Sequence, residues 1–179
     1  VALGDFRVFT GGTNGALPRP VTRTIYNADG QVTQIDRGTG TDATAGTFTA
    51  LARTGFTYDL AGNRIRATDY DGATTTPLLV TQTSYDAADR PLCLAVRMNP
   101  AIYGSLPSDA CTLGTAGSNG EDRITRTTYD AAGQVLVQTR AYGTPLAQAY
   151  VTTSYTDNGK PATQTDASIT RRFGGTGLG

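Results

Sequence analysis

The stretch Ile124–Arg140, which reads ITRTTYDAAGQVLVQTR, contains the pattern on which the fold depends. Its first part, Ile124–Tyr129, is rich in β-branched residues and lacks Gly and Pro, as is typical of a strand with a half-buried face. The next four residues, Asp130–Gly133, predict a tight turn. An Asp at the first position can accept hydrogen bonds from backbone N–H groups just ahead, and Gly at the fourth tolerates the left-handed conformation that closes a bulged hairpin.

Four further copies of this hairpin pattern occur in the chain, at Val21–Asp36, Gly55–Asp69, Val80–Val96 and Val151–Ala167. Each copy has a tyrosine before its turn: Tyr26, Tyr58, Tyr85, Tyr129 and Tyr155. The turns begin at Asn27, Asp59, Asp86, Asp130 and Thr156, and their fourth residues are Gly30, Gly62, Asp89, Gly133 and Gly159. Such self-similarity is typical of repeat proteins, in which one unit cannot bury its own apolar face. We therefore expect an all-β chain whose hairpins pair edge to edge, because isolated hairpins are marginal in water.

Four positions depart from the pattern. In the last copy Thr156 replaces Asp, and the turn-forming residues Asp157–Gly159 still follow it. Asp89 stands where the other turns have Gly, which is tolerable because Asp enters the left-handed region more readily than most residues. Pro91 and Pro161 lie two residues past the fourth turn position. Neither can donate a ladder hydrogen bond there, so both predict a sheet edge or a local bulge.

The recurring tyrosine has two interpretations. In the structural one, the rings form a ladder from hairpin to hairpin, and each hydroxyl finds a hydrogen-bond partner or water. We favour this interpretation because the ring lies at the turn, where neighbouring hairpins must pack. In the other, a row of exposed rings binds the faces of sugars.

The five hairpin repeats form one region, residues 21–167. Residues 1–20 are interpreted as an incoming strand or linker, and residues 168–179 as the start of a further segment. Two stretches between hairpins, Arg37–Ala50 and Asp71–Leu79, are rich in Gly, Thr and Ala, and we expect them to be linkers. Since the chain starts at Val1 without a Met or a leader-like stretch, we expect it to be the interior of a longer polypeptide.

An insertion at about 97–122 separates the third and fourth copies. The chain has two cysteines: Cys93 lies shortly before the insertion, and Cys111 lies within it. Because the insertion is polar and has little core of its own, we predict that these cysteines form a disulfide, which implies an oxidising compartment. Two buried thiols in a reducing compartment remain the alternative. A zinc site is disfavoured, since two sulfurs without any His leave too few ligands.

The composition argues against several functional classes. The chain has 15 basic and 15 acidic residues, so a basic surface for nucleic acid is not expected. The chain also has no His, which excludes Ser-His-Asp and Cys-His nucleophile pairs within it. Most carboxylates that could form a catalytic pair are turn residues with a local structural role. We therefore expect no catalytic, cofactor-binding or metal-binding residues, and no membrane span, because no long apolar stretch occurs.

The segments Tyr85–Arg90 (YDAADR) and Tyr129–Gln134 (YDAAGQ) resemble the YD repeat of Rhs proteins, which teneurins and the shell-forming subunits of Tc toxins share. This resemblance implies hairpins wound into a spiralling sheet that can close into a hollow β-shell, often around a C-terminal toxin. The self-cleaving motif and toxin tail of that family have no matching positions in this chain.

The resemblance leads to an expected function. We expect a non-enzymatic structural segment of a large secreted or cell-surface protein. Its partners would be further repeats of the same chain or of neighbouring copies, and in addition a toxin cargo or surface glycans. The alternative is an extracellular filament-forming or carbohydrate-binding adhesive protein.

Overall fold

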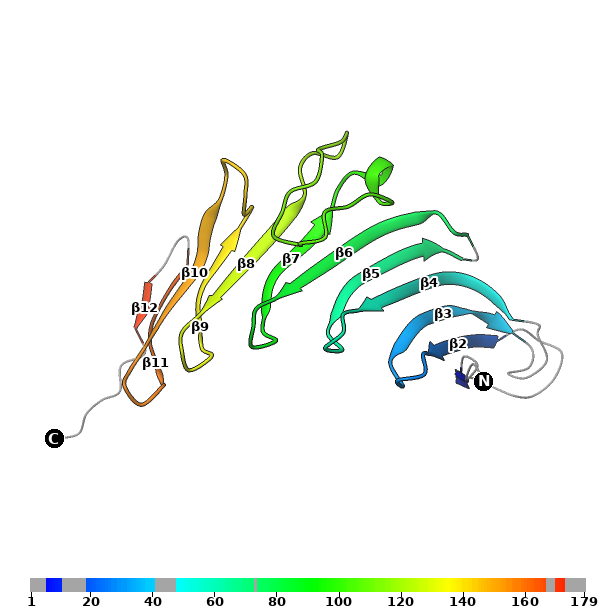
Figure 1. Cartoon of the computed structure of the whole chain (residues 1–179), viewed down its shortest axis with the longest axis horizontal. Coiled ribbons are helices and arrows are strands. Elements are labelled where there is room, and N and C mark those ends of the chain that lie inside the picture. The colour runs from blue at the N-terminus through cyan, green and yellow to red at the C-terminus, as the bar shows by residue number, and fades with distance from the viewer. Residues whose placement is uncertain (1–5, 11–18, 41–47, 73, 167–169, 173–179) are drawn as a thin grey trace. The chain divides into compact units, whose positions relative to one another are not determined.

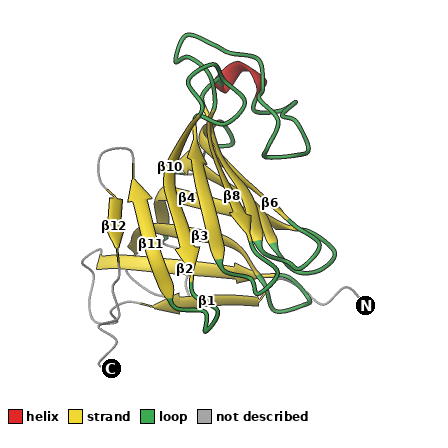
Figure 2. Cartoon of the chain, turned by 90° about the vertical axis from the view of Figure 1, so that its left-hand side faces the viewer, coloured by secondary structure: helices red, strands yellow, loops and turns green. Residues whose placement is uncertain are grey.

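The computed structural model describes residues 6–10, 19–40, 48–72, 74–166 and 170–172, and it is all-β, as predicted (Figure 1). Strands make up nearly all of the regular structure in these residues, and the single helical element is the short 3-10 helix η1 (Figure 2). The elements in chain order are β1 (Phe6–Thr10), β2 (Arg19–Tyr26), β3 (Val32–Gly40), β4 (Thr49–Tyr58), β5 (Arg64–Asp71), β6 (Pro77–Tyr85), β7 (Pro91–Arg97), η1 (Pro100–Ile102), β8 (Arg123–Tyr129), β9 (Val135–Arg140), β10 (Gln148–Tyr155), β11 (Pro161–Asp166) and β12 (Thr170–Arg172).

The chain divides into two compact units. The first comprises Val1–Gln82 with Pro100–Gly104, and the second comprises Thr83–Asn99 with Ser105–Gly179. In the first unit, β1 to β6 follow one another in chain order, each antiparallel to the next. In the second unit, β7 to β12 are arranged in the same way. Within each unit the succession is open, since no pairing among the described residues joins its first strand to its last.

The hairpins pair with one another edge to edge, as predicted. Besides the pairing within each hairpin, the second strand of one hairpin pairs with the first strand of the next, in the pairs β3–β4, β5–β6, β7–β8 and β9–β10. The outer strands β2 and β11, near Val21 and Ala167, are covered by β1 and β12 of the same chain. One further strand, β1 or β12, therefore follows the repeat hairpins at each end of the described chain.

The prediction that Arg37–Ala50 and Asp71–Leu79 are linkers is wrong for most of the described residues in them. Residues 37–40 continue β3, Thr49 begins β4 and Pro77 begins β6, while residues 41–47 lie outside the described part. These residues have weak strand propensity, and their pairing with neighbouring strands overrides it.

The core of each unit is small and partly polar. Buried apolar side chains include Val21 and Val80 in the first unit, and Cys93, Ala95 and Ile124 in the second. Buried polar side chains accompany them: Asp36, Thr68, Gln82, Arg97 and Asp122. Because polar side chains are buried in the core, hydrogen bonds and ion pairs must contribute much of the specificity of packing.

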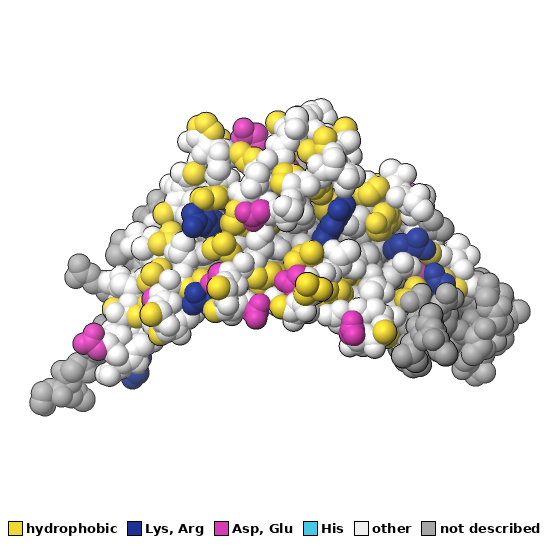
Figure 3. Space-filling model, in the orientation of Figure 1, with side chains coloured by type: hydrophobic (Ala, Val, Ile, Leu, Met, Phe, Trp, Pro, Cys, Tyr) yellow, Lys and Arg dark blue, Asp and Glu magenta, His cyan; other side chains and the backbone are white. Residues whose placement is uncertain are grey.

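On the face shown in Figure 3, charged side chains are scattered among apolar ones and do not gather into a patch.

Candidate functional site

The five turns share one hydrogen-bond geometry. The backbone N–H of the fourth residue donates to the carbonyl of the first over 2.8–3.2 Å in every turn, and the fourth residue has φ between +56° and +91°. The first residue's side chain accepts the N–H of the fifth residue: Asn27 from Gln31 at 2.8 Å, Asp59 from Asn63 at 2.8 Å, Asp86 from Arg90 at 3.0 Å, Asp130 from Gln134 at 2.8 Å and Thr156 from Lys160 at 3.1 Å. Local side-chain chemistry thus determines where each hairpin reverses.

A β-bulge lies immediately before the tyrosine in four of the hairpins. The register shifts between Ile25 and Tyr26, Thr57 and Tyr58, Thr128 and Tyr129, and Ser154 and Tyr155. Pro161 lies opposite Tyr155 at the last of these bulges, as the missing N–H of proline predicts. The extra residue lies on the second strand of each hairpin, so the tyrosine faces the first residue of that strand.

The tyrosine hydroxyls connect three of the hairpins to the one before. Tyr58 donates to the carbonyl of Val32 at 2.7 Å, Tyr129 to that of Pro91 at 2.8 Å and Tyr155 to that of Val135 at 3.0 Å. In all three cases the acceptor is the first residue of the preceding hairpin's second strand. Burial and the nearby Asp86 carboxylate raise the pKa of Tyr129, so its hydroxyl keeps its proton as a donor.

The fifth turn residue makes a second connection, in the opposite direction. Gln31 donates to the carbonyl of Gly62 at 3.4 Å, Arg90 to that of Asp130 at 3.2 Å and Gln134 to that of Gly159 at 2.7 Å. Each acceptor lies in the turn of the following hairpin. At these three junctions, neighbouring hairpins therefore contact each other through two side chains, one reaching the preceding hairpin and one reaching the following hairpin.

A constant register aligns these contacts. At all four junctions, the residue three before the tyrosine pairs with the third residue of the preceding strand: Gly55 with Gln34, Gln82 with Arg66, Arg126 with Cys93 and Thr152 with Val137. Because side chains alternate with a period of two, this register gives each tyrosine the same position relative to the preceding hairpin. The junction is thus the unit that repeats.

A buried carboxylate holds three strands of the first unit together. Asp36 on β3 is fully buried and accepts hydrogen bonds from Arg23 on β2, Arg53 on β4 (2.9 Å) and Gln34 (2.9 Å). Arg23 and Arg53 are the cross-strand partners of Asp36 on either side. Burial raises the pKa of Asp36, but the hydrogen bonds from Arg23, Arg53 and Gln34 outweigh it, so the pKa lies below the usual value.

The insertion has its own polar core in the second unit. Arg97, which is fully buried, donates to Asp122 at 2.6 Å and to the carbonyl of Thr112 at 2.7 Å. Asp122 also accepts the backbone N–H groups of Met98 and Gly114. Burial raises the pKa of Asp122, and these N–H groups and Arg97 together lower it below the ordinary value. The two ends of the insertion are thereby held to each other.

The predicted disulfide is confirmed. Cys93 and Cys111 are bonded with their Cα atoms 5.2 Å apart, and Cys93 packs with Ala95, Ala110 and Ile124. The β9–β10 loop adds Tyr142, whose backbone N–H donates to the carbonyl of Ile124 at 3.0 Å and whose hydroxyl accepts from Arg126 at 2.8 Å. A disulfide is typical of proteins in oxidising compartments.

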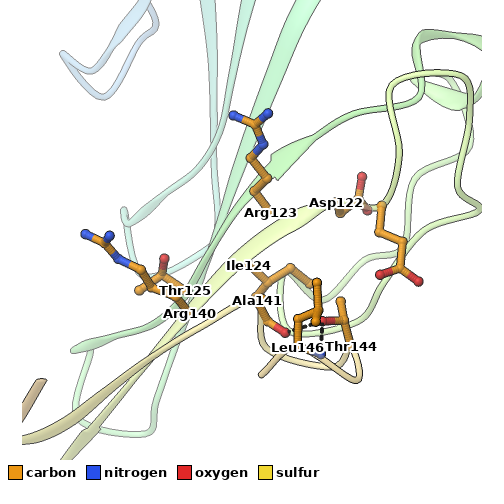
Figure 4. Close-up of a pocket in the computed structure, with 9 residues that line it drawn as sticks. Asp122, Arg123, Ile124, Thr125, Arg140, Ala141, Thr144 and Leu146 are labelled. Carbon is orange, nitrogen blue, oxygen red and sulfur yellow. Dashed lines mark hydrogen bonds between the residues drawn. The ribbon is translucent and has the colours of Figure 1, made fainter. Parts of the chain in front are cut away.

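A cavity of about 550 Å³ lies between the end of the insertion and the β9–β10 loop in the second unit (Figure 4). Its lining includes Arg123 and Thr125 from β8, Arg140 from the end of β9, the apolar residues Ile124, Ala141 and Leu146, and the acidic residues Glu121 and Asp122. Ala141 has φ of +51°, a conformation that costs energy for a residue with a Cβ. The cavity combines charged and apolar residues, and sequence reasoning did not identify it.

Comparison with known proteins gives no relative: no protein-family model matches the chain, and no curated protein matches it. In the described part of the chain, no helix has the length and apolar character to cross a membrane.

The residues predicted from the repeat lie where the pattern placed them, at turns and junctions. The glycines at the fourth turn position have the expected positive φ, as does Asp89. Sequence reasoning missed the forward contact of the fifth turn residue, for which Gln31 and Gln134 at equivalent positions were the available signal. It also missed the Arg97–Asp122 pair, although these residues are the predicted bounds of the insertion.

Proposed function

We propose that the chain is a non-enzymatic structural segment of a larger secreted or cell-surface protein of the Rhs/YD-repeat kind. In this proposal its hairpins continue into further repeats and build a spiralling β-shell, of the type that surrounds a C-terminal toxin. In this proposal the chain forms part of the shell and catalyses no reaction. The junction between hairpins is the observation that carries the proposal.

That junction supports extension because it is generic. The same register, tyrosine contact and forward contact recur between hairpins that differ in most other residues. A further hairpin carrying a tyrosine at the equivalent position can dock on an exposed strand in the same way. Arrays built from nearest-neighbour contacts of this kind grow by adding units.

Free strand edges support the same conclusion. Among the described residues, β1 and β12 each pair on one side alone, so a row of backbone N–H and C=O groups is available on the other. In the proposed shell these edges pair with further repeats of the same chain. In the alternative, an extracellular filament, they pair with neighbouring copies.

The test is concentration-dependent association of the 179-residue chain. We expect larger species in sedimentation velocity as concentration rises, with hydrogen exchange slowing in β1 and β12 and unchanged in the interior strand β4. Electron microscopy then separates the two assemblies, because closed particles support the shell and continuous fibres support the filament. A monomer at all concentrations, with slow exchange in β1 and β12, would contradict both.

A carbohydrate-binding surface is the competing functional class. It requires the rings of Tyr129 and Tyr155 to stack on sugars, whereas both hydroxyls are already bonded to backbone carbonyls. Glycan-array binding that disappears in Tyr129→Ala and Tyr155→Ala, with the β-sheet spectrum retained, would favour the adhesive function over the scaffold.

A further inference from the structure

The cavity beside the β9–β10 loop has a cationic end and an apolar end. Arg123 and Arg140 form the cationic end, and Ala141 and Leu146 form the apolar end (Figure 4). Leu146 is highly exposed, so its side chain is available to a ligand. A volume of about 550 Å³ lies in the range of small-molecule sites.

The two arginines are neighbours on one face of the sheet. Arg126 pairs with Thr139, so Thr125 and Arg140 come opposite each other one step along β8 and β9. Arg123, two residues before Thr125, shares that face and is a diagonal neighbour of Arg140. Diagonal positions are near enough for two long side chains to reach a common group.

No carboxylate of the described chain neutralises this pair. Neither guanidinium group makes a hydrogen bond or ion pair with a described residue; Arg140 lies over the ring of Tyr150, 3.4 Å from its centroid. The lining also contains two acids: Asp122 is bound to Arg97, and Glu121 makes no ion pair with Arg123 or Arg140. In Figure 4 the guanidinium groups of Arg123 and Arg140 point in different directions.

The first unit shows how this protein satisfies such a pair. There Arg23 and Arg53 lie on the strands that flank β3, and the carboxylate of Asp36 lies between them. Charge-assisted contacts from two guanidinium groups are among the strongest that a carboxylate makes in proteins. Arg123 and Arg140 are arranged differently, because they lie on the two adjacent strands β8 and β9, and the residue opposite Arg140 is Thr125, which carries no charge.

We propose that this cavity binds a small organic carboxylate. Arg140, held against Tyr150, is the fixed anchor for the carboxylate, and Arg123 turns toward it. The apolar body of the ligand rests on Ala141 and Leu146. The site is independent of the assembly proposed above, since it lies within one unit and uses neither β1 nor β12.

Phenylacetate is a suitable probe, and phenylacetamide is its neutral counterpart. We expect phenylacetate to give saturable shifts of the arginine Nε–H signals of Arg123 and Arg140 and of the amide signals of Ile124, Ala141 and Thr144 in NMR titrations. The amide should bind at least about ten-fold more weakly, because it lacks the charge that both arginines recognise.

The test variant is Arg123→Gln with Arg140→Gln, and the matched control is Arg37→Gln with Arg64→Gln. The control removes the same charge, and Arg64 lies over an aromatic ring, that of Phe56, as Arg140 does over Tyr150. Binding should be lost in the first variant and retained in the second. Equal binding of acid and amide, non-saturable shifts, or equal loss in both variants would overturn the proposal. The wild-type titration decides it even if the first variant misfolds.

Discussion

A tyrosine hydroxyl links each of three hairpins to the one before it, at Tyr58, Tyr129 and Tyr155. Replacing any of these residues by Phe keeps the ring and leaves a strand carbonyl without its donor. We expect each replacement to lower the free energy of unfolding by about 1 kcal/mol, measured by urea denaturation.

Tyr150→Phe is the matched control, because its hydroxyl makes no hydrogen bond within the described residues while its ring contacts Arg140. The control should change stability little. If Tyr129→Phe and Tyr150→Phe have the same effect, the hydroxyl contact contributes nothing to the junction.

Asp36 makes the stability of the first unit sensitive to acid. Its pKa in the folded chain is below the unfolded value of 3.8, so its contribution is fully present above that value and is lost as the pH falls through the folded pKa. Asp36→Asn should lower the free energy of unfolding by about 2–4 kcal/mol at neutral pH, since Arg23 and Arg53 then lack their carboxylate.

In the Asp36→Asn variant, the stability of the first unit should also depend less on pH below about pH 4. Denaturation midpoints from pH 7 down to pH 2 measure both effects. An Asp36→Asn chain whose midpoint falls with acid as steeply as that of the wild type would show that other carboxylates dominate.

At the scale of the element, the turn depends on one backbone conformation. Gly133 has φ of +84° and open space around the position of a Cβ, its nearest neighbour being 3.8 Å away. Gly133→Ala should therefore cost about 1–2 kcal/mol through backbone strain alone. Gly104→Ala is the control, because Gly104 also has open space but no positive φ. Thermal denaturation should separate the two variants, and equal melting temperatures would refute a strain at the turn.

The turns could be predicted from sequence because they are local. Asp130 and Gly133 are three residues apart, and the chemistry of both is visible in the sequence. The strand ends at Gly40 and Pro77 could not be predicted, because pairing with distant residues extends these strands. Arg97 and Asp122 are 25 residues apart, and their contact depends on the fold of the whole insertion. The cavity could not be predicted because the β9–β10 loop forms part of it. Nothing in the sequence indicates the positive φ of Ala141 in that loop.

For the whole molecule, each unit has a buried ion pair made from its own residues. Asp36 organises β2, β3 and β4 in the first, and Asp122 organises the insertion beside β7 and β8 in the second. Repeat proteins distribute stability over nearest neighbours, so local damage has local effects. Hydrogen exchange measured by mass spectrometry can locate such effects.

We expect Asp36→Asn to accelerate exchange chiefly in residues 19–40 and 48–72, and Asp122→Asn chiefly in residues 91–147. Asp71→Asn makes the same chemical change at an exposed side chain and should alter neither region. If both buried variants instead accelerate exchange uniformly along the chain, the protein unfolds as one cooperative body. A stack of hairpins connected only through their junctions would then be the wrong physical description, because the opening of one unit would require the opening of the other.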